Sequence, residues 1–427
     1  MRKIVLFFVF AAFGIAAFTQ NYVHRVLVLN EGYFDFMTGE VVTPPSIGAY
    51  DPATGEYALL NELEEARFIS GIAMDESHYY VSADGHLLKY DRYTDELVTS
   101  TSLTGIRKLA VWNEQLIVTR GEFGIELEDY IRVLDKNSLA TIYTIPSATM
   151  PYTTEGIVVY DNNAYIAVNN GFVFGGEVGM LAVLDLAAAA ITATIDLGPN
   201  GINPDNIMLD GDVIYTLNNK DYSGSSVSSY RVSSGDLSTN DLINVTSGCG
   251  TSALYNSEVF YQDFASTAIT RYDPETNEIL EELELGNNLY GLTFDAINER
   301  FYAGVTDFFS SGTLYAFDLD GNVLDAVEVS VSPGTIALDV RTATGIEDVA
   351  AVTAIQIFPN PAAERIVISS AEGRVRIFNA AGNLVAEQLS NEGNNLEMDI
   401  SDFSAGLYLV QVTRLDGSVS TANFIRQ

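Results

Sequence analysis

The feature that most constrains the fold is one phrase that recurs along the chain. An apolar strand ends in an aromatic residue or Leu followed by Asp, and a tight turn comes next. The copies end at Asp51, Asp91, Asp135, Asp185, Arg231, Asp273 and Asp318. Successive copies are 40, 44, 50, 46, 42 and 45 residues apart. This spacing is the length of one four-stranded blade of a β-propeller. We therefore predict an all-β ring of sheets.

Each copy has the pattern of four short antiparallel strands. β-Branched and aromatic residues alternate with polar ones, and Asp, Asn and Gly punctuate the segments. Residues 26–30 match a second strand with no first strand ahead of it, and residues 334–339 match a first strand with no successors. We expect the later segment to complete the sheet that the earlier one begins, which removes exposed sheet edges. Seven blades are predicted, with six or eight as the alternatives.

The N-terminus has the composition of a secretory signal peptide. Arg2 and Lys3 precede an apolar run over residues 4–18, and small residues lie before Gln20. We predict a signal peptide over residues 1–19; an N-terminal membrane anchor is the alternative. The single cysteine, Cys249, allows no internal disulfide and is too far along the chain for a lipoprotein anchor. We interpret it as a small buried residue and not as a nucleophile.

The charge of the chain limits its partners. It has 21 Lys and Arg against 57 Asp and Glu, a formal net charge of −36. Residues 20–353 account for 14 of the basic and 49 of the acidic residues. Nucleic acid is excluded as a partner because its phosphates reward Lys and Arg, and anionic lipid is disfavoured for the same reason. The predicted ring is an acidic, soluble object.

The turn Tyr272-Asp273-Pro274-Glu275-Thr276, with the similar turn after Tyr50, resembles the YVTN-type surface-layer propellers. The resemblance covers roughly residues 22–345 and implies a seven-bladed β-propeller. Members of that group mostly bind ligands or partners, some of them vitamins or sugars. The fifth copy departs from the pattern because Arg231 replaces Asp. The propeller domain is placed at residues 20–342.

The end of the chain resembles a type A C-terminal sorting domain of the type IX secretion system. The residues that carry this resemblance are Phe358, Pro359, Asn360, Pro361, Gly382, Gly406 and Tyr408. It implies a small Ig-like β-sandwich over residues 354–427, after a linker at residues 343–353. It also implies the type IX machinery as a partner, and passage through the periplasm to the outer surface or the medium. The alternative is an ordinary Ig-like accessory module.

No catalytic motif stands out, so we expect a monomeric binding module and not an enzyme. The three histidines lack metal-ligand spacing, and no nucleophile elbow or phosphate loop is present. No cofactor is expected, and Ca²⁺ is kept open as a metal that carboxylates could hold. A lyase or hydrolase that uses carboxylates of the channel is one alternative function. A structural or adhesive surface protein is another.

The predicted binding face is the mouth of the ring where the long loops gather, because recognition concentrates on loops that a rigid scaffold holds. These are the second-to-third and fourth-to-first loops, which are rich in aromatic residues. The ligand could be a small molecule, a glycan or a protein. The candidate contact residues are Phe34, Arg67, Arg120, Glu122, Tyr152, Asn170, Asn219, Asp263 and Tyr290.

Overall fold

Every copy of the repeat ends the third strand of a four-stranded antiparallel sheet. The computed structural model describes residues 20–220, 224–343, 355–369, 373–380, 382–390, 395–413 and 419–427. The predicted signal peptide, residues 344–353 of the predicted linker and the side chain of Cys249 lie outside this description. The chain divides into two compact units between Arg341 and Thr342. Within the described ranges the structure is all-β and has no helix, and hence none long and apolar enough to cross a membrane.

The first unit contains seven four-stranded sheets among its described residues. In each sheet the strands are hydrogen-bonded to their neighbours in order from the first strand to the fourth. The closing sheet is β30 (Pro333–Ala343), β1 (Gln20–Asn30), β4 (Ser46–Asp51) and β5 (Glu56–Glu62). The next two are β6 (Ile69–Met74), β7 (His78–Ala83), β8 (His86–Asp91), β9 (Leu97–Ser102), and β10 (Ile106–Trp112), β11 (Gln115–Arg120), β12 (Asp129–Asp135), β13 (Thr141–Pro146).

The remaining four sheets follow in chain order. Two are β14 (Thr154–Tyr160), β15 (Asn163–Val168), β16 (Met180–Asp185), β17 (Ala190–Asp196), and β18 (Pro204–Asp210), β19 (Val213–Asn218), β20 (Ser225–Arg231), β21 (Leu237–Leu242). The last two are β22 (Ser247–Tyr255), β23 (Glu258–Asp263), β24 (Ala268–Asp273), β25 (Glu278–Glu284), and β26 (Gly291–Asp295), β27 (Arg300–Val305), β28 (Ser311–Asp318), β29 (Val323–Val331). A hairpin of β2 (Tyr33–Asp35) and β3 (Glu40–Thr43) lies between β1 and β4.

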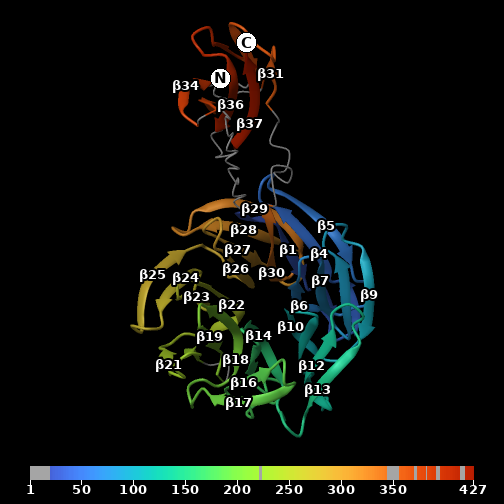
Figure 1. Ribbon diagram of the computed structural model, residues 1–427. Coiled ribbons are helices and arrows are strands. Elements are labelled where there is room, and N and C mark those ends of the chain that lie inside the picture. Colours follow the sequence, from blue (N-terminus) through green and yellow to red (C-terminus); the bar gives the residue numbers. More distant parts are fainter. Residues whose placement is uncertain are drawn as a thin grey trace, which may run out of the picture. The chain divides into compact units, whose positions relative to one another are not determined.

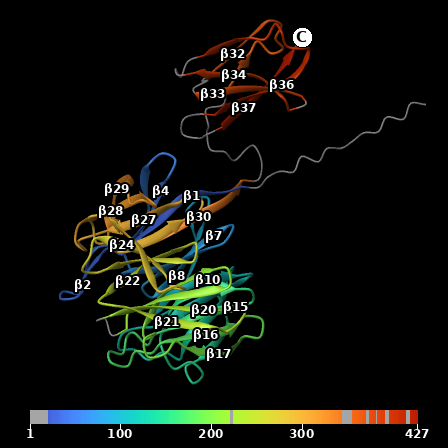
Figure 2. The ribbon, with the colours of Figure 1, turned by 90° about the vertical axis from the view of Figure 1, so that its left-hand side faces the viewer.

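The sheets form a β-propeller. The first strands lie nearest the centre of the ring and the fourth strands lie at its outside (Figure 1); Figure 2 shows the ring from the side. The apolar core lies between neighbouring sheets. Tyr302 and Leu314 of one sheet pack on Val28 and Tyr50 of the closing sheet, and Leu29 of the closing sheet packs toward β6 and β7. Second strands are buried on both faces for this reason, whereas fourth strands are mostly exposed.

The predicted closure of the ring is confirmed. The C-terminal strand β30 pairs with β1 in one sheet, so the ring closes between distant parts of the chain. The Asp after each third strand holds a turn: the Asp51 carboxylate accepts the backbone N–H of Ala53 at 2.8 Å, and Asp91 accepts that of Tyr93 at 2.8 Å. In the fifth copy Arg231 instead pairs with Asp212 at 2.9 Å.

A second contact network fixes the closing sheet. The buried Asp339 of β30 accepts hydrogen bonds from Arg25 Nε at 3.0 Å, Arg92 Nε at 2.7 Å and Arg341 Nη2 at 2.9 Å. Arg25 lies on β1 and Arg92 lies in the turn between β8 and β9. Arg25 also forms a bidentate pair with Asp95 of that turn, at 2.7 and 2.8 Å. Asp339 therefore joins the closing sheet to the sheet that follows it.

The second unit is a small β-sandwich, as predicted. One sheet has β31 (Ile357–Phe358), β32 (Arg365–Ile368) and β35 (Leu396–Asp399), and the other has β34 (Leu384–Ser390), β33 (Gly373–Asn379), β36 (Gly406–Thr413) and β37 (Val419–Arg426). Both sheets contribute to one apolar core, with Ile366 on one side and Ile377, Val410 and Phe424 on the other.

Candidate functional site

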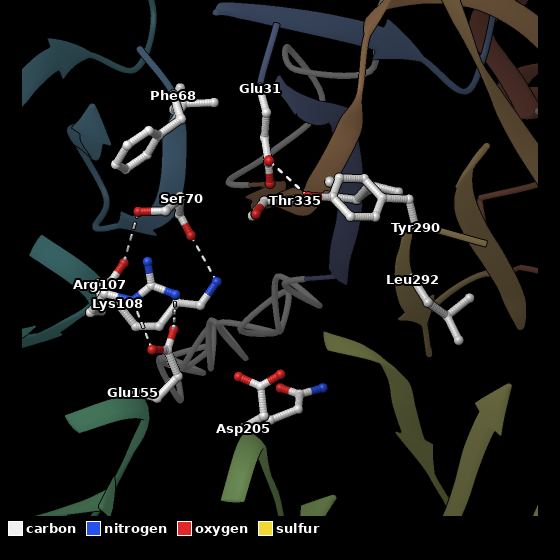
Figure 3. Close-up of a pocket in the computed structure, with 14 residues that line it drawn as sticks. Glu31, Phe68, Ser70, Arg107, Lys108, Glu155, Asp205, Tyr290, Leu292 and Thr335 are labelled. Atoms are coloured by element: carbon white, nitrogen blue, oxygen red, sulfur yellow. Dashed lines mark hydrogen bonds and ion pairs between the residues drawn. The ribbon is translucent and has the colours of Figure 1, made fainter. Parts of the chain in front are cut away.

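A polar cavity of about 410 Å³ lies at the centre of the propeller, where the first strands begin. It falls within the range of small-molecule sites. The side chains that line it come from β6, β10, β14, β18 and β30, and from the residues just after β1 and around the start of β26 (Figure 3). Second-to-third loops leave the antiparallel sheets at this same end, so the cavity opens among them.

A β-bulge near the start of five first strands aims side chains into this region. The register of β6, β10, β14, β18 and β22 against their second strands shifts near the same place in each sheet. A bulge places an extra residue in one strand and redirects its side chain. The residues within the shifts of the first four strands include Ser70, Arg107 and Lys108, Glu155, and Asp205, and all of these line the cavity.

Hydrogen bonds across neighbouring sheets hold the cavity wall. Arg107 forms a bidentate pair with Glu155, with Nε to Oε2 at 2.7 Å and Nη2 to Oε1 at 3.0 Å. Its guanidinium also lies 5.1 Å from the ring centre of Phe172. Burial alone would lower the pKa of Arg107, but the charge and hydrogen bonds of Glu155 outweigh burial and raise it. Arg107 therefore carries a fixed positive charge.

Lys108 and Asp205 place one charge of each sign beside this pair. Lys108 Nζ donates to the Ser70 carbonyl at 2.7 Å. An ammonium has three donors, so the other two can reach a ligand. The Asp205 carboxylate accepts from Asn219 Nδ2 at 3.1 Å, and a carboxylate has further acceptor positions. The wall can both donate to a ligand and accept from it.

Glu31 and Tyr290 complete the wall on the closing side of the ring. Tyr290 donates from its hydroxyl to Glu31 Oε2 at 2.7 Å. Gly334 of β30 leaves the room for this pair, because a Cβ there would lie 2.5 Å from Glu31 Oε1. Burial raises the pKa of the Glu31 carboxyl, although the Tyr290 hydrogen bond and the charges of Lys108 and Arg107 oppose it. Glu31 thus holds its proton to a higher pH than an ordinary Glu.

This shift predicts a pH dependence of stability. A carboxyl with a raised pKa contributes stability that is complete below its ordinary value of about 4.3 and is lost as pH rises through the folded value. The free energy of unfolding of the wild type, relative to Glu31→Gln, should fall by about 1.4 kcal/mol for each pH unit between the two pKa values. Urea unfolding of both proteins from pH 4 to pH 8 measures this. A constant difference would contradict the assignment.

Two smaller cavities adjoin the central one. One of about 210 Å³ shares Arg107, Glu155 and Asp205 and reaches Phe172 and Asn219. Another of about 180 Å³ shares Lys108, Asp205 and Thr335, and lies along the first strands. Gly156 lets β14 and β18 approach there, because its Cβ would lie 2.6 Å from Ile207 Cγ2. The three cavities therefore adjoin one another through these shared residues.

Two of the nine predicted contact residues line these cavities: Tyr290 in the central one and Asn219 in the smaller one. Arg67 lies next to the central cavity, paired with Asp84 at 2.6 and 2.7 Å and with its guanidinium 5.9 Å from the ring centre of Phe34. Glu122 lies near enough to raise the pKa of Arg67, together with Asp84, which is the main cause. The predicted residues Arg67, Phe34 and Glu122 thus form part of the rim of the central cavity.

The other four predicted residues hold the scaffold. Arg120 is buried, pairs with Asp129 at 2.6 Å and donates to the Thr104 carbonyl. Asn170 donates to the Gly176 carbonyl at 2.7 Å within its own loop. Asp263 accepts the backbone N–H groups of Thr246 and Ala265, and Tyr152 packs on the core between β10–β13 and β14–β17.

The sequence prediction missed Glu31, Arg107, Lys108, Glu155 and Asp205. Their shared signal is position: a charged or polar residue stands just ahead of the apolar part of a first strand, as in Glu155-Gly156-Ile157 and Asp205-Asn206-Ile207. The sequence prediction placed the binding face on the long loops instead. Among the described residues, no group of three or more His, Cys, Asp or Glu side chains is placed to hold a metal ion.

The residues of the predicted sorting signal lie at several places in the sandwich. Asn360 accepts the backbone N–H of Ile425 at 3.0 Å and donates to the Asn423 carbonyl at 3.0 Å, which joins the Phe358–Pro361 segment to β37. Tyr408 stacks on Phe424 with ring centres 5.3 Å apart. Gly382 takes a positive φ of 79° in the turn between β33 and β34, and Gly406 begins β36.

Comparison with known proteins identifies the C-terminal unit. Residues 356–426 match a family model described as a secretion system C-terminal sorting domain. This domain directs export through the type IX secretion system to the cell surface or the medium. The chain is also 35% identical over 78 residues to ulvan lyase NLR42 of Nonlabens ulvanivorans, which is 17% of this chain and 14% of the lyase.

Solved structures resemble the chain in fold alone. The extracellular domain of the putative one component system BT4673 from B. thetaiotaomicron has a TM-score of 0.53 at 11% identity, over 94% of this chain and 57% of that one. The hydrazine synthase of Kuenenia stuttgartiensis has a TM-score of 0.51 at 11% identity, over 67% of this chain and 90% of that one. Neither likeness carries a function to this chain.

Proposed function

We propose that the chain is an exported, non-catalytic binding protein that takes a small, hydroxyl-rich ligand into the central cavity. The observation that carries the proposal is the mixed wall of the cavity, where Lys108 can donate and Asp205 can accept. A neutral hydroxyl both donates and accepts, so such a ligand can use both groups. The two cations and three acids of the wall offset one another when Glu31 keeps its proton.

The three acidic side chains support binding over catalysis. Each has a partner in the protein: Glu31 with Tyr290, Glu155 with Arg107, and Asp205 with Asn219. A general base must instead reach a proton of its substrate. We also propose that the seven four-stranded sheets are seven blades of a YVTN-type propeller, supported by the Tyr-Asp phrase at the end of the third strands.

A thermal-shift screen of the full chain tests the binding proposal. The panel contains neutral mono- and disaccharides, vitamins and Ca²⁺. A neutral hydroxylated compound should raise the midpoint of unfolding, because a ligand that binds only the folded state stabilises it. Lys108→Gln and Asp205→Asn should each weaken that binding about tenfold or more, the effect of losing a hydrogen bond to a charged group.

The control removes a comparable charge from the opposite rim. Lys136 follows β12 and pairs with Asp75 at 3.4 Å, and Lys136→Gln should leave the ligand shift unchanged. Equal shifts in wild type, Lys108→Gln and Asp205→Asn would contradict the use of this cavity. A response to Ca²⁺ alone would favour a metal-binding role instead.

A second candidate function is a lyase or hydrolase that uses the channel carboxylates. It is supported by the short match to ulvan lyase NLR42 and by the raised pKa of Glu31, which suits a general acid. Incubation with polysaccharides, followed by assay for new reducing ends or unsaturated products, tests it. Product that disappears in Glu31→Gln would favour the enzyme. A structural or adhesive role is favoured if no soluble ligand binds and cell attachment depends on the protein.

A further inference from the structure

Exposed aromatic side chains extend outward from the central cavity in three arms, all on loops at its open end. The first arm begins at Tyr290 in the cavity wall, whose ring centre lies 4.9 Å from that of Phe308. Phe308 is 48% exposed, and its neighbour Phe309 is 65% exposed and lies 5.1 Å from Tyr33. This arm joins the β27–β28 loop to the β2–β3 hairpin.

The second arm begins at Phe172, which lines the adjoining cavity under Arg107. The same β15–β16 loop carries Phe174, which is 73% exposed. Its ring centre lies 6.4 Å from that of Phe123, which is 65% exposed on the β11–β12 loop. Two neighbouring sheets thus present a pair of rings to solvent.

The third arm begins at Phe68 in the cavity wall. The Arg67 guanidinium lies 5.1 Å from the Phe68 ring centre and 5.9 Å from that of Phe34. Phe34 meets Phe36 edge to face at 4.9 Å, and Phe36 is 82% exposed. Large apolar side chains exposed together on one face of a soluble protein mark an interaction site.

We propose that these arms bind a neutral polysaccharide chain whose end unit occupies the central cavity. This inference rests on the proposed function and names its ligand class. The rings are separate platforms that lead into a polar cavity, which suits a ligand with apolar faces and hydroxylated edges. A pyranose chain has both. A protein partner would instead need a continuous apolar interface centre with a polar rim.

Charge selects a neutral chain over an acidic one. Residues 20–353 carry 14 basic against 49 acidic residues, so the field of the ring repels polyanions. The charge of Arg107 in the cavity wall is already balanced by its pair with Glu155. The second cation of the wall, Lys108, is matched by the carboxylate of Asp205, so the wall has no excess of positive charge. A chain of carboxylated or sulfated sugars would meet net repulsion along its length.

The test is affinity electrophoresis of the full chain in gels containing neutral polysaccharides (laminarin, xylan, mannan or starch) or the polyanion alginate. The wild type should be retarded by a neutral polymer. Phe123→Ala combined with Phe174→Ala, and separately Phe36→Ala, should weaken this retardation at least about tenfold, as loss of an aromatic anchor does. These side chains are exposed, so the variants are expected to fold.

Tyr93→Ala is the matched control, because Tyr93 is 65% exposed but lies in the turn after β8, at the opposite rim. It should leave the retardation unchanged. Equal retardation of wild type and the arm variants would overturn the proposal, as would failure of every neutral polymer or stronger binding of alginate. The thermal shift by a small sugar is a separate measurement. If a small sugar still raises the midpoint of unfolding but no polymer binds, the role of the arms is contradicted and the proposal of ligand binding in the cavity is kept. Specific capture of one protein through Phe36 and Phe174, without polymer binding, would also overturn it.

Discussion

Deletion of residues 354–427 is expected to remove the protein from the cell surface and the medium almost completely. The deleted residues include the whole matched sorting domain, which forms a unit of its own with its own apolar core. Because this unit is what the type IX machinery recognises, no other part of the chain should replace it. Immunoblotting of cell fractions from a bacterium with a type IX system measures the outcome.

Point variants test whether export requires the sandwich to be folded and not only present in the chain. Phe424 is fully buried at the centre of the core, and Phe424→Ala should destabilise the sandwich by about 3–5 kcal/mol. We expect export to fall with it. Leu389→Ala is the control, since Leu389 is 63% exposed. Normal surface display of the deletion variant would overturn the role of this domain in export.

The second large effect is expected at Asp339, where Asp339→Asn should destabilise the propeller by about 3–5 kcal/mol. Asn keeps the shape of the side chain but removes the charge that three arginines share, Arg25, Arg92 and Arg341. Arg25 keeps its pair with Asp95, but Arg92 and Arg341 lose the carboxylate that balances their charges, and a buried charge that is not compensated is costly. Urea unfolding of the full chain measures it, with Asp320→Asn as an exposed control.

The same variant carries a pH signature. Burial alone would raise the pKa of Asp339, but hydrogen bonds from Arg341 and Arg92 outweigh burial and hold it below its ordinary value. A carboxyl with a lowered pKa contributes stability that is complete above its ordinary value of about 3.9 and is lost as pH falls through the folded value. The advantage of the wild type over Asp339→Asn should therefore be full at neutral pH and shrink below pH 4. An advantage that persists unchanged at pH 2 would contradict this.

The ring could be predicted from sequence because its repeat depends on local chemistry. An Asp ends the third strand in six of the seven copies and caps its own turn, so the phrase can be recognised from short stretches of sequence. Ring closure was predictable as well, because an unmatched second strand at one end and an unmatched first strand at the other end can complete each other. The sorting domain was recognisable from motifs in fixed order near the end of the chain.

The cavity could not be predicted in the same way. Glu31 and Tyr290 are 259 residues apart and meet only because the ring closes. Arg107, Glu155 and Asp205 lie within strands, where alternation alone would not send them to the centre; the bulges do so. Arg120 shows the converse: its place at the end of β11, before a long loop, predicts a ligand contact, whereas in the structure the side chain is buried and paired with Asp129.

The pairing of β1 with β30 also sets an order of events for a chain that emerges N-terminus first. Arg25 and Asp339 are 314 residues apart. The closing sheet therefore lacks its first strand, β30, until nearly the entire propeller has emerged. Until then β1 presents an unpaired edge, which is a template for association with another copy. Folding of this protein is therefore most vulnerable to self-association in the interval before its last propeller strand becomes available.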